Sequence, residues 1–147
     1  MSANRMQSVV DVHVLFLNDQ NECLFLRRAN TGYKDGQYSL VAGHLERNES
    51  IEECAIREAA EEANVGVNAI DLKLECVMRR DAEQNRISFF FECRTWTGCI
   101  ENNEPEKCDD LTWRKLTDLP NPMVDYVAAA INDIQKGKIL SDFSPRS

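Results

Sequence analysis

The sequence has no long apolar run. Across its 147 residues, no uninterrupted stretch reaches the ~20 apolar residues that a helix needs to cross a bilayer. The residues before the first apolar segment also lack the hydrophobic centre of a secretory signal. We therefore expect a protein that does not span a membrane and is not secreted, which places it in the cytoplasm.

Basic charge is scarce. The chain has 17 Lys and Arg residues against 25 Asp and Glu residues, which gives a net charge of −8 and an isoelectric point of about 4.8. Proteins that bind nucleic-acid polymers generally carry the opposite sign, so this class is excluded. An anionic small molecule is also disfavoured, unless a cation lies between it and the protein.

The six cysteines include no C-x-x-C pair, the spacing typical of structural zinc sites. An even number leaves a disulfide framework open. However, a chain of this length can build a core without cross-links, so we expect free thiols in a reducing compartment. The composition is ordinary for a globular protein. We expect residues 1–147 to form one domain, with a core over about 6–136 and a polar, frayed tail after Ile139.

Alternation of apolar and polar residues predicts the β-strands. Val12, Val14 and Phe16 would share one face of the first strand. We expect strands at residues 9–17, 23–28, 72–78 and 87–93, shorter extended segments at 38–41 and 111–116, and loops at 29–37 and 97–110.

Two helices are expected between and after the strands. Ser50 followed by Glu53 is a capping-box pattern, which predicts a helix ending near residue 63. Asn64 stands where a left-handed residue ends a helix. Apolar residues at helical spacing over residues 124–134 predict a second helix. Because strands cannot bury their inner faces alone, we predict an α/β fold with two main helices covering a mixed β-sheet.

Three carboxylates lie on one face of the first helix. Glu58, Glu61 and Glu62 stand at i, i+3 and i+4, so their side chains point the same way. Two interpretations stay open: a solvated acidic face, or a site where a hard cation such as Mg²⁺ binds carboxylates together with substrate phosphates. The window 43–65 has seven acids and two bases, a net charge of 2 − 7 = −5.

A longer pattern surrounds these carboxylates. Gly43 is followed after five residues by Glu49, and after seven more by the segment 57–65, Arg-Glu-Ala-Ala-Glu-Glu-Ala-Asn-Val. This resembles the Nudix box, G-x5-E-x7-R-E-U-x-E-E-x-G-U, where U is apolar. The last glycine is replaced by Asn64, and Asn tolerates the left-handed conformation better than most residues do.

The resemblance to the Nudix family implies a fold and a chemistry. It implies an α/β/α sandwich and hydrolysis of a phosphoanhydride bond in a nucleoside diphosphate derivative. The implied cofactor is Mg²⁺, with Mn²⁺ as the alternative. Glu58, Glu61 and Glu62 are the implied metal ligands, together with the carbonyl of Gly43. Glu58 or Glu61 is also the implied base that activates water.

The resemblance also implies that one acidic and one basic residue of the motif have a positioning role. Glu49 and Arg57 are implied to form an ion pair that orients the helix. The alternative is an ordinary surface pair, which contributes about 0–1 kcal/mol.

A second, shorter resemblance lies downstream. The segment 104–108, Glu-Pro-Glu-Lys-Cys, is similar to a loop in MutT-related members that clean the nucleotide pool. Glu104 and Glu106 are candidates for a further acidic ligand, or are plain loop acids. Arg27 and Arg28 are candidates for phosphate contacts, or are exposed residues at a strand end.

Recognition of a base needs a flat apolar surface with a few polar groups. Five residues are either candidates for this surface or members of the core: Tyr33, Phe90, Trp113, Met123 and Tyr126. His13 is expected near the surface of its strand.

Three functions stay open. The first is Mg²⁺-dependent hydrolysis of nucleoside triphosphates, normal or oxidised, to a monophosphate and pyrophosphate. The second is the same chemistry on ADP-ribose or a nucleotide sugar. The third is a non-catalytic nucleotide-binding Nudix module, which the intact box glutamates disfavour. The expected partner is a small-molecule nucleotide, neither a nucleic-acid polymer nor a membrane. Homodimers are common among similar proteins.

Overall fold

The computed structural model of this chain describes residues 4–144. Its elements in chain order are β1 (Val9–Phe16), β2 (Glu22–Arg28), β3 (Tyr38–Ser39), β4 (Val41–His44), α1 (Ile51–Ala63), the 3₁₀ helix η1 (Ala69–Asp71), β5 (Leu72–Asp81), β6 (Asn85–Cys93), β7 (Cys108–Lys115), α2 (Asp125–Gln135) and β8 (Leu140–Phe143).

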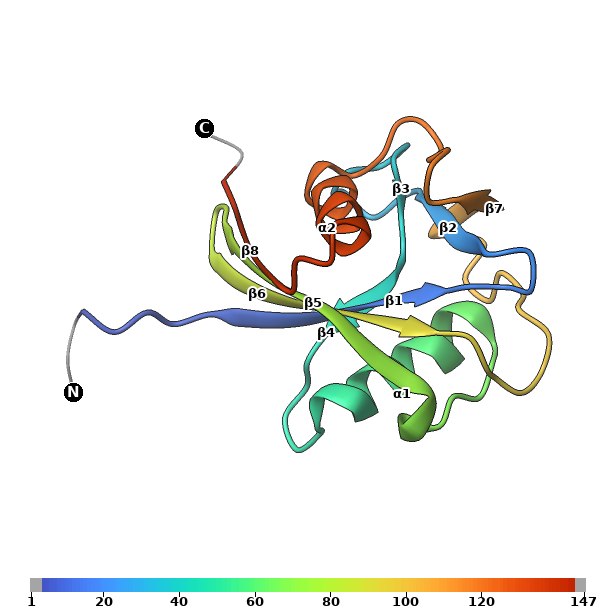
Figure 1. Cartoon of the computed structure of the whole chain (residues 1–147), viewed down its shortest axis with the longest axis horizontal. Helices are drawn as coiled ribbons and strands as arrows, with labels where there is room; N and C mark the ends of the chain where they lie inside the picture. Colours follow the sequence, from blue (N-terminus) through green and yellow to red (C-terminus); the bar gives the residue numbers. More distant parts are fainter. Residues whose placement is uncertain (1–3, 145–147) are drawn as a thin grey trace.

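The strands form two sheets (Figure 1). The larger has the order β4-β1-β6-β5-β8, and the smaller has the order β3-β2-β7. In the larger sheet β1 and β6 are parallel, as are β5 and β8, whereas β1–β4 and β5–β6 are antiparallel. Helix α1 packs against β4 and β1, and α2 packs against β5 and β8, on the opposite face of the sheet (Figure 1). The predicted mixed sheet between two helices is confirmed, and the separate three-stranded sheet is an addition to it.

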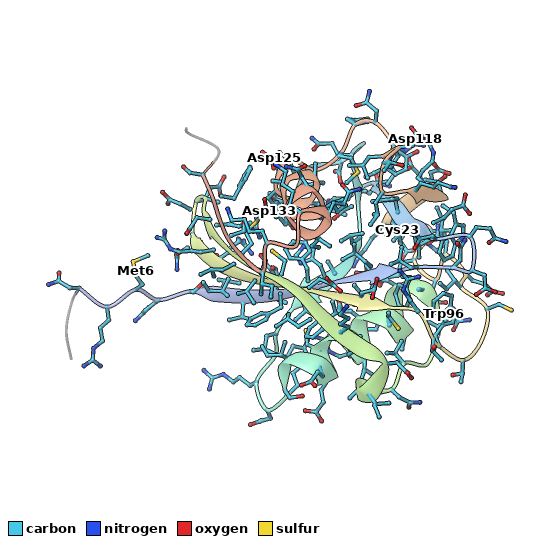
Figure 2. All side chains as sticks on the ribbon, in the orientation of Figure 1. Met6, Cys23, Trp96, Asp118, Asp125 and Asp133 are labelled. Carbon is cyan, nitrogen blue, oxygen red and sulfur yellow. The ribbon has the colours of Figure 1, made fainter. Side chains whose placement is uncertain are left out.

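Strand β1 explains why both faces of the larger sheet are covered. Val12, Val14 and Phe16 pack in the core on the α1 side, as the alternation predicts. Leu15 packs in the core on the α2 side. A strand that is apolar on both faces requires a layer on each side. Side chains fill both spaces, whereas Met6 lies out on the extended segment before β1 (Figure 2).

Helix α1 begins and ends where its sequence signals predict. Ser50 Oγ accepts a hydrogen bond from the Glu53 N–H at 3.1 Å, and Glu53 Oε1 accepts one from the Ser50 N–H at 2.7 Å. Asn64 follows the helix with φ 61° and ψ 35°, the left-handed conformation. These caps satisfy backbone groups that the helix ends leave without partners.

Two predictions about irregular segments are wrong. Residues 140–143 are not frayed, because they form β8, which pairs in parallel with β5; the predicted tail beyond residue 144 lies outside the described residues. Ser141 in β8 is 4% exposed, and its Oγ–H donates to Asp133 Oδ2 at 2.5 Å. Strand β7 begins at Cys108, inside the predicted loop 97–110. Both strands are added at sheet edges by long-range pairing, which a short local pattern does not reveal.

The core forms without disulfide bonds between the cysteines. All six are free thiols, as expected, and Cys99 is the one that is exposed. Within residues 4–144, no helix is long and apolar enough to cross a membrane.

Candidate functional site

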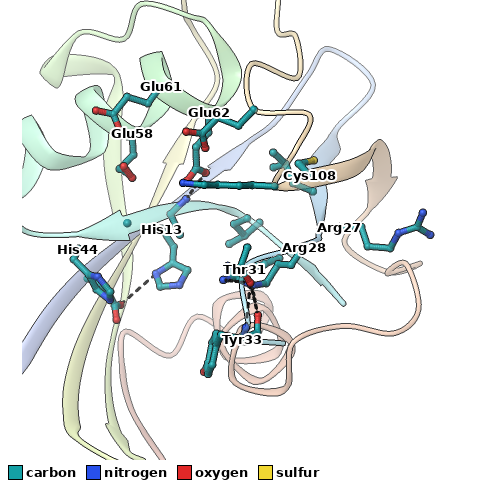
Figure 3. Close-up of a pocket in the computed structure, with 18 of the residues that line it drawn as sticks. His13, Arg27, Arg28, Thr31, Tyr33, His44, Glu58, Glu61, Glu62 and Cys108 are labelled. Carbon is teal, nitrogen blue, oxygen red and sulfur yellow. Dashed lines mark hydrogen bonds and ion pairs between the residues drawn. The ribbon is translucent and has the colours of Figure 1, made fainter. Parts of the chain in front are cut away.

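A cleft of about 810 Å³ lies beside β4, the end strand of the larger sheet. It is lined by residues of β1 and β4, of β2 in the smaller sheet, of α1, and of the segment before β7. The α1 glutamates lie on one side of β4, and His13 and His44 lie on the other (Figure 3). The cleft therefore has two ends of different chemistry, joined along the strand.

We call the first end the acidic end, formed by Glu58, Glu61 and Glu62. All three line the cleft. Glu58 is 7% exposed, which is far deeper than a solvated acidic face would place it. Glu62 is half-buried, and its Oε1 accepts a hydrogen bond from the Ala42 N–H at 3.1 Å. The i, i+3, i+4 spacing thus turns carboxylates toward β4.

Burial makes this end electrostatically costly in the absence of a cation. It raises the pKa of Glu58 to about 7, with further contributions from Glu61 and Glu104. It also raises the pKa of Glu62 well above its usual value, with a further contribution from Glu58. Crowded, desolvated carboxylates favour the neutral form, and a divalent cation would reverse that preference.

The donor set fits a hard cation that is shared with a substrate. Among residues 4–144, no group of three or more His, Cys, Asp and Glu side chains has the geometry of a metal site by itself. Mg²⁺ usually binds one or two carboxylates and takes its other ligands from water and substrate phosphates. An open, oxygen-only set of glutamates is therefore suited to this ion.

Arg57 connects the acidic end to the loop before the helix. Its Nε and Nη2 donate to the two carboxylate oxygens of Glu49 at 3.0 and 2.9 Å, so the predicted ion pair is present. Its Nη1 lies 3.1 Å from Glu58 and 3.3 Å from Glu61. The hydrogen bonds from Arg57 lower the pKa of Glu49 to about 2. Arg57 thus offsets the like-charge repulsion along α1.

Gly43 is required for a close approach that sequence analysis missed. A Cβ atom added at this residue would overlap the carboxylate of Glu58. Nη2 of Arg57 also donates to the carbonyl of His44 at 3.0 Å, which ties α1 to the end of β4. The glycine of the motif therefore makes room for the buried glutamate of the same motif.

The two candidate phosphate contacts both line the cleft. Arg27 Nε donates to Asp109 Oδ1 at 2.7 Å. Arg28 Nε donates to the carbonyl of Tyr33 at 2.7 Å, and its Nη2 donates to Thr31 Oγ1 at 3.2 Å. Both arginines are held in place by neighbours at the rim of the cleft.

The structure separates the two candidate loop acids. Glu104 lines the cleft, and its charge contributes to the raised pKa of Glu58 and of Glu62. Glu106 is not among the residues that line the cleft, although its carbonyl accepts a hydrogen bond from the Asn30 side chain.

Of the five candidates for base contact, Tyr33 and Tyr126 line the cleft. Phe90 lies in the core, and Met123 and Trp113 are partly buried and pack against it. An aromatic residue in a sheet is usually core, and sequence alone does not separate the exceptions.

We call the second end the polar floor, formed by Asp11, His13, Arg80 and Tyr126, all of which line the cleft. The expectation that His13 lies near the sheet surface is wrong, because it is 1% exposed. It lies on the face of β1 that α2 covers, stacked on Phe90 with ring centroids 4.5 Å apart. Burial lowers the pKa of His13 to about 4.

The floor as a unit could not be predicted from the sequence. Its signal was two polar residues, Asp11 and His13, spaced by two in an otherwise apolar strand. Nothing in the local sequence of Arg80 indicates that it reaches Asp11, 69 positions away.

Comparison with known proteins agrees with this architecture. Residues 7–133 match the family model described as NUDIX domain. A solved MutT NUDIX hydrolase from Burkholderia pseudomallei has a TM-score of 0.78 and 22% identity, covering 86% of this chain and 97% of that chain. The MutT protein from Methanosarcina mazei Go1 has a TM-score of 0.75 and 18% identity, covering 91% and 97%. The NUDIX domain of Shewanella oneidensis NrtR, solved with ADP ribose, has a TM-score of 0.71 and 18% identity, covering 90% and 89%.

Proposed function

This chain belongs to the Nudix hydrolase family, and we propose that it hydrolyses nucleoside triphosphates, normal or oxidised, to a nucleoside monophosphate and pyrophosphate. The acidic end of the cleft carries this proposal. Its glutamates belong to the segment that matches the Nudix box. Burial raises the pKa of Glu58 and of Glu62, which favours their neutral form until a cation is bound. This is the arrangement expected of a site that binds metal and phosphate together.

Glu58, Glu61 and Glu62 are the proposed ligands of Mg²⁺, or of Mn²⁺ in its place, with the carbonyl of Gly43 as a further ligand. When bound, such a cation polarises phosphoryl oxygens, lowers the pKa of water and neutralises the leaving phosphate. Without it, the negative cleft would repel a polyphosphate.

The side chains of the chain itself position the reaction. Glu58 or Glu61 accepts the proton of the attacking water, whose oxygen forms the new bond to phosphorus while the bridging phosphorus–oxygen bond breaks. Arg57, fixed by Glu49, holds the acid face of α1 in place. Arg27 and Arg28 at the rim are the proposed contacts for phosphate oxygens, and Glu104 is the further acid beside the glutamates. Phosphoryl transfer depends mainly on such positioning and charge compensation.

The six free cysteines support a reducing compartment, so we place this activity in the cytoplasm. The proposed partner is the nucleotide itself.

A substrate panel tests the proposal. Deoxynucleoside and ribonucleoside triphosphates, oxidised dGTP, ADP-ribose and nucleotide sugars are incubated with protein and Mg²⁺, and products are identified by chromatography and mass. The proposal predicts a monophosphate and pyrophosphate from triphosphates. Release of orthophosphate alone from triphosphates would contradict it.

One observation favours a second candidate. The similar NUDIX domain from Shewanella oneidensis was solved with ADP ribose, which is also a diphosphate flanked by a nucleoside. Preferential cleavage of ADP-ribose in the panel, giving AMP and ribose phosphate, would replace the first proposal by this one.

A further inference from the structure

The polar floor contains buried polar groups that the hydrolysis itself does not use. Its four residues come from β1, β5 and α2, and their exposed fractions lie between 1% and 8%. They line the same cleft as the α1 glutamates, and His13 lies across β4 from those glutamates (Figure 3). A nucleotide whose phosphates lie at the acidic end would therefore place its nucleoside toward this floor.

Arg80 is the centre of the floor. Its Nη2 donates to Asp11 Oδ2 at 2.9 Å, and its Nε donates to Ser88 Oγ at 3.0 Å. Its guanidinium carbon lies 3.6 Å from the ring centroid of Tyr126. In the described part of the chain, Nη1 has no hydrogen-bond partner, although Arg80 lines the cleft. The guanidinium is thus held by three neighbours, and both N–H groups of Nη1 are left over.

The floor is poorly explained as a device for stability. A buried ion pair such as Asp11–Arg80 often contributes no more than a well-packed apolar pair would. Asp11 Oδ1 and His13 Nδ1 lie 3.5 Å apart, and both are buried without a hydrogen bond in residues 4–144. Such orphaned groups cost folding free energy, and costs of this kind are typical of functional sites.

What the floor presents to a ligand is a set of donors. Asp11 Oδ2 accepts from Arg80 and lies 3.7 Å from Arg86 Nη1, and Asp11 Oδ1 is buried. Arg86 also lines the cleft and contacts His44 Nε2 at 3.1 Å. Two guanidinium groups therefore face the cleft against one carboxylate that is already paired.

We infer that the polar floor recognises the base of the substrate and prefers a keto base, such as guanine or thymine, to adenine or cytosine. This inference rests on the proposed function, since it requires a nucleotide in the cleft. Arginine N–H groups pair with carbonyl oxygens and ring nitrogens, as they do with O6 and N7 of guanine. The exposed amino group of adenine or cytosine is a donor and would face the donors of Arg80.

Tyr33 supplies an aromatic wall beside the floor. It lines the cleft, and the guanidinium of Arg28 lies 5.4 Å from its ring centroid. Its loop is ordered by Asp35, which accepts hydrogen bonds from the backbone N–H groups of Thr31 and Gly32 at 3.0–3.2 Å. A flat ring and a donor floor together make a base pocket.

The first experiment measures kcat/KM of the wild-type protein for dGTP, dTTP, dATP and dCTP with saturating Mg²⁺. We expect dGTP and dTTP to exceed dATP and dCTP by at least about tenfold, mainly through KM. Equal values for the four, or a preference for dATP and dCTP, would overturn this inference and leave the hydrolysis standing. Hydrolysis of none of them by folded protein would overturn the proposed function and this inference with it.

The second experiment compares two tyrosine variants, because removing Arg80 itself would leave Asp11 buried and unpaired. The Tyr126 hydroxyl lies 2.8 Å from His13 Nε2, so Tyr126→Phe keeps the ring beside Arg80 and removes the contact that anchors this ring to His13. Tyr38→Phe is the matched control. Tyr38 is equally exposed, at 8%, and its hydroxyl hydrogen-bonds Asp110, but it does not line the cleft.

We expect Tyr126→Phe to reduce the keto-to-amino ratio of kcat/KM by about fivefold or more. Tyr38→Phe should leave the ratio unchanged. Thermal unfolding of both variants separates recognition from structure. If Tyr126→Phe lowered only the melting temperature and kept the ratio, the hydroxyl would be structural and the inference would be wrong.

Discussion

At the scale of single residues, burial of the acidic end lowers the stability of the fold when no cation is bound. Glu58 is buried against Gly43 and held by Arg57, yet burial raises its pKa to about 7. A raised pKa means that the stabilising contribution of this carboxyl is present below pH 4.5 and is lost as the pH rises through 7. The folded protein without metal is therefore penalised at neutral and alkaline pH.

Replacing Glu58 by Gln should remove this penalty. In EDTA, we expect Glu58→Gln to raise the free energy of unfolding at pH 8 by about 1–2 kcal/mol, after allowance for partial solvent screening, and to change it little at pH 5. Urea unfolding at the two pH values measures this. Glu52→Gln, an exposed acid of the same helix, is the control. An equal effect of Glu58→Gln at both pH values would contradict the raised pKa.

Gly43 gives a second prediction at this scale. An added methyl group displaces the Glu58 carboxylate, and a displacement of about 1 Å in a reactive site can reduce activity about 100-fold. Gly43→Ala should therefore lower kcat/KM by roughly that factor, with the circular dichroism spectrum unchanged. Near wild-type activity would show that the close approach is unimportant.

At the scale of elements, α1 is the part of the fold that sequence predicts best. Its cap, its end and its acidic face depend on residues within four positions of each other, so local spacing determines them. Strand β8 and the buried state of His13 depend instead on pairing and packing between distant segments. Local pattern assigned His13 to a strand but not to the inside of the molecule. The Arg80–Asp11 contact and the Gly43–Glu58 approach were missed for the same reason.

The end of α1 can be tested directly. Asn64 is left-handed, and its side-chain amide donates to Glu101 Oε2 at the long distance of 3.5 Å. Asn64→Gly should change the free energy of unfolding by less than about 0.5 kcal/mol, whereas Asn64→Ala should lower it by about 1 kcal/mol, because a Cβ atom without local hydrogen bonding is strained there. Chemical denaturation of both variants measures these changes in the free energy of unfolding. A loss for Asn64→Gly as large as that for Asn64→Ala would show a specific role of the amide, which both variants lack.

At the scale of the whole molecule, the charged residues are distributed unevenly along the cleft. The chain carries −8 overall, with acids at one end of the cleft and arginines at its rim and floor. A metal bound to the folded state alone stabilises it by mass action. We expect Mg²⁺ at 100 times its dissociation constant to raise the free energy of unfolding by about 2.7 kcal/mol. Absence of any Mg²⁺-dependent shift would contradict metal binding by the free protein.

The most direct test of the central claim is Mg²⁺-dependent release of pyrophosphate from nucleoside triphosphates by the wild type, Glu61→Gln and Glu62→Gln. Each substitution keeps the shape of the side chain and removes one negative charge from the acidic end. We expect turnover by the wild type that is abolished in both variants, with the fold intact by circular dichroism. Near wild-type turnover by either variant would contradict the assignment of these glutamates as the metal and catalytic site.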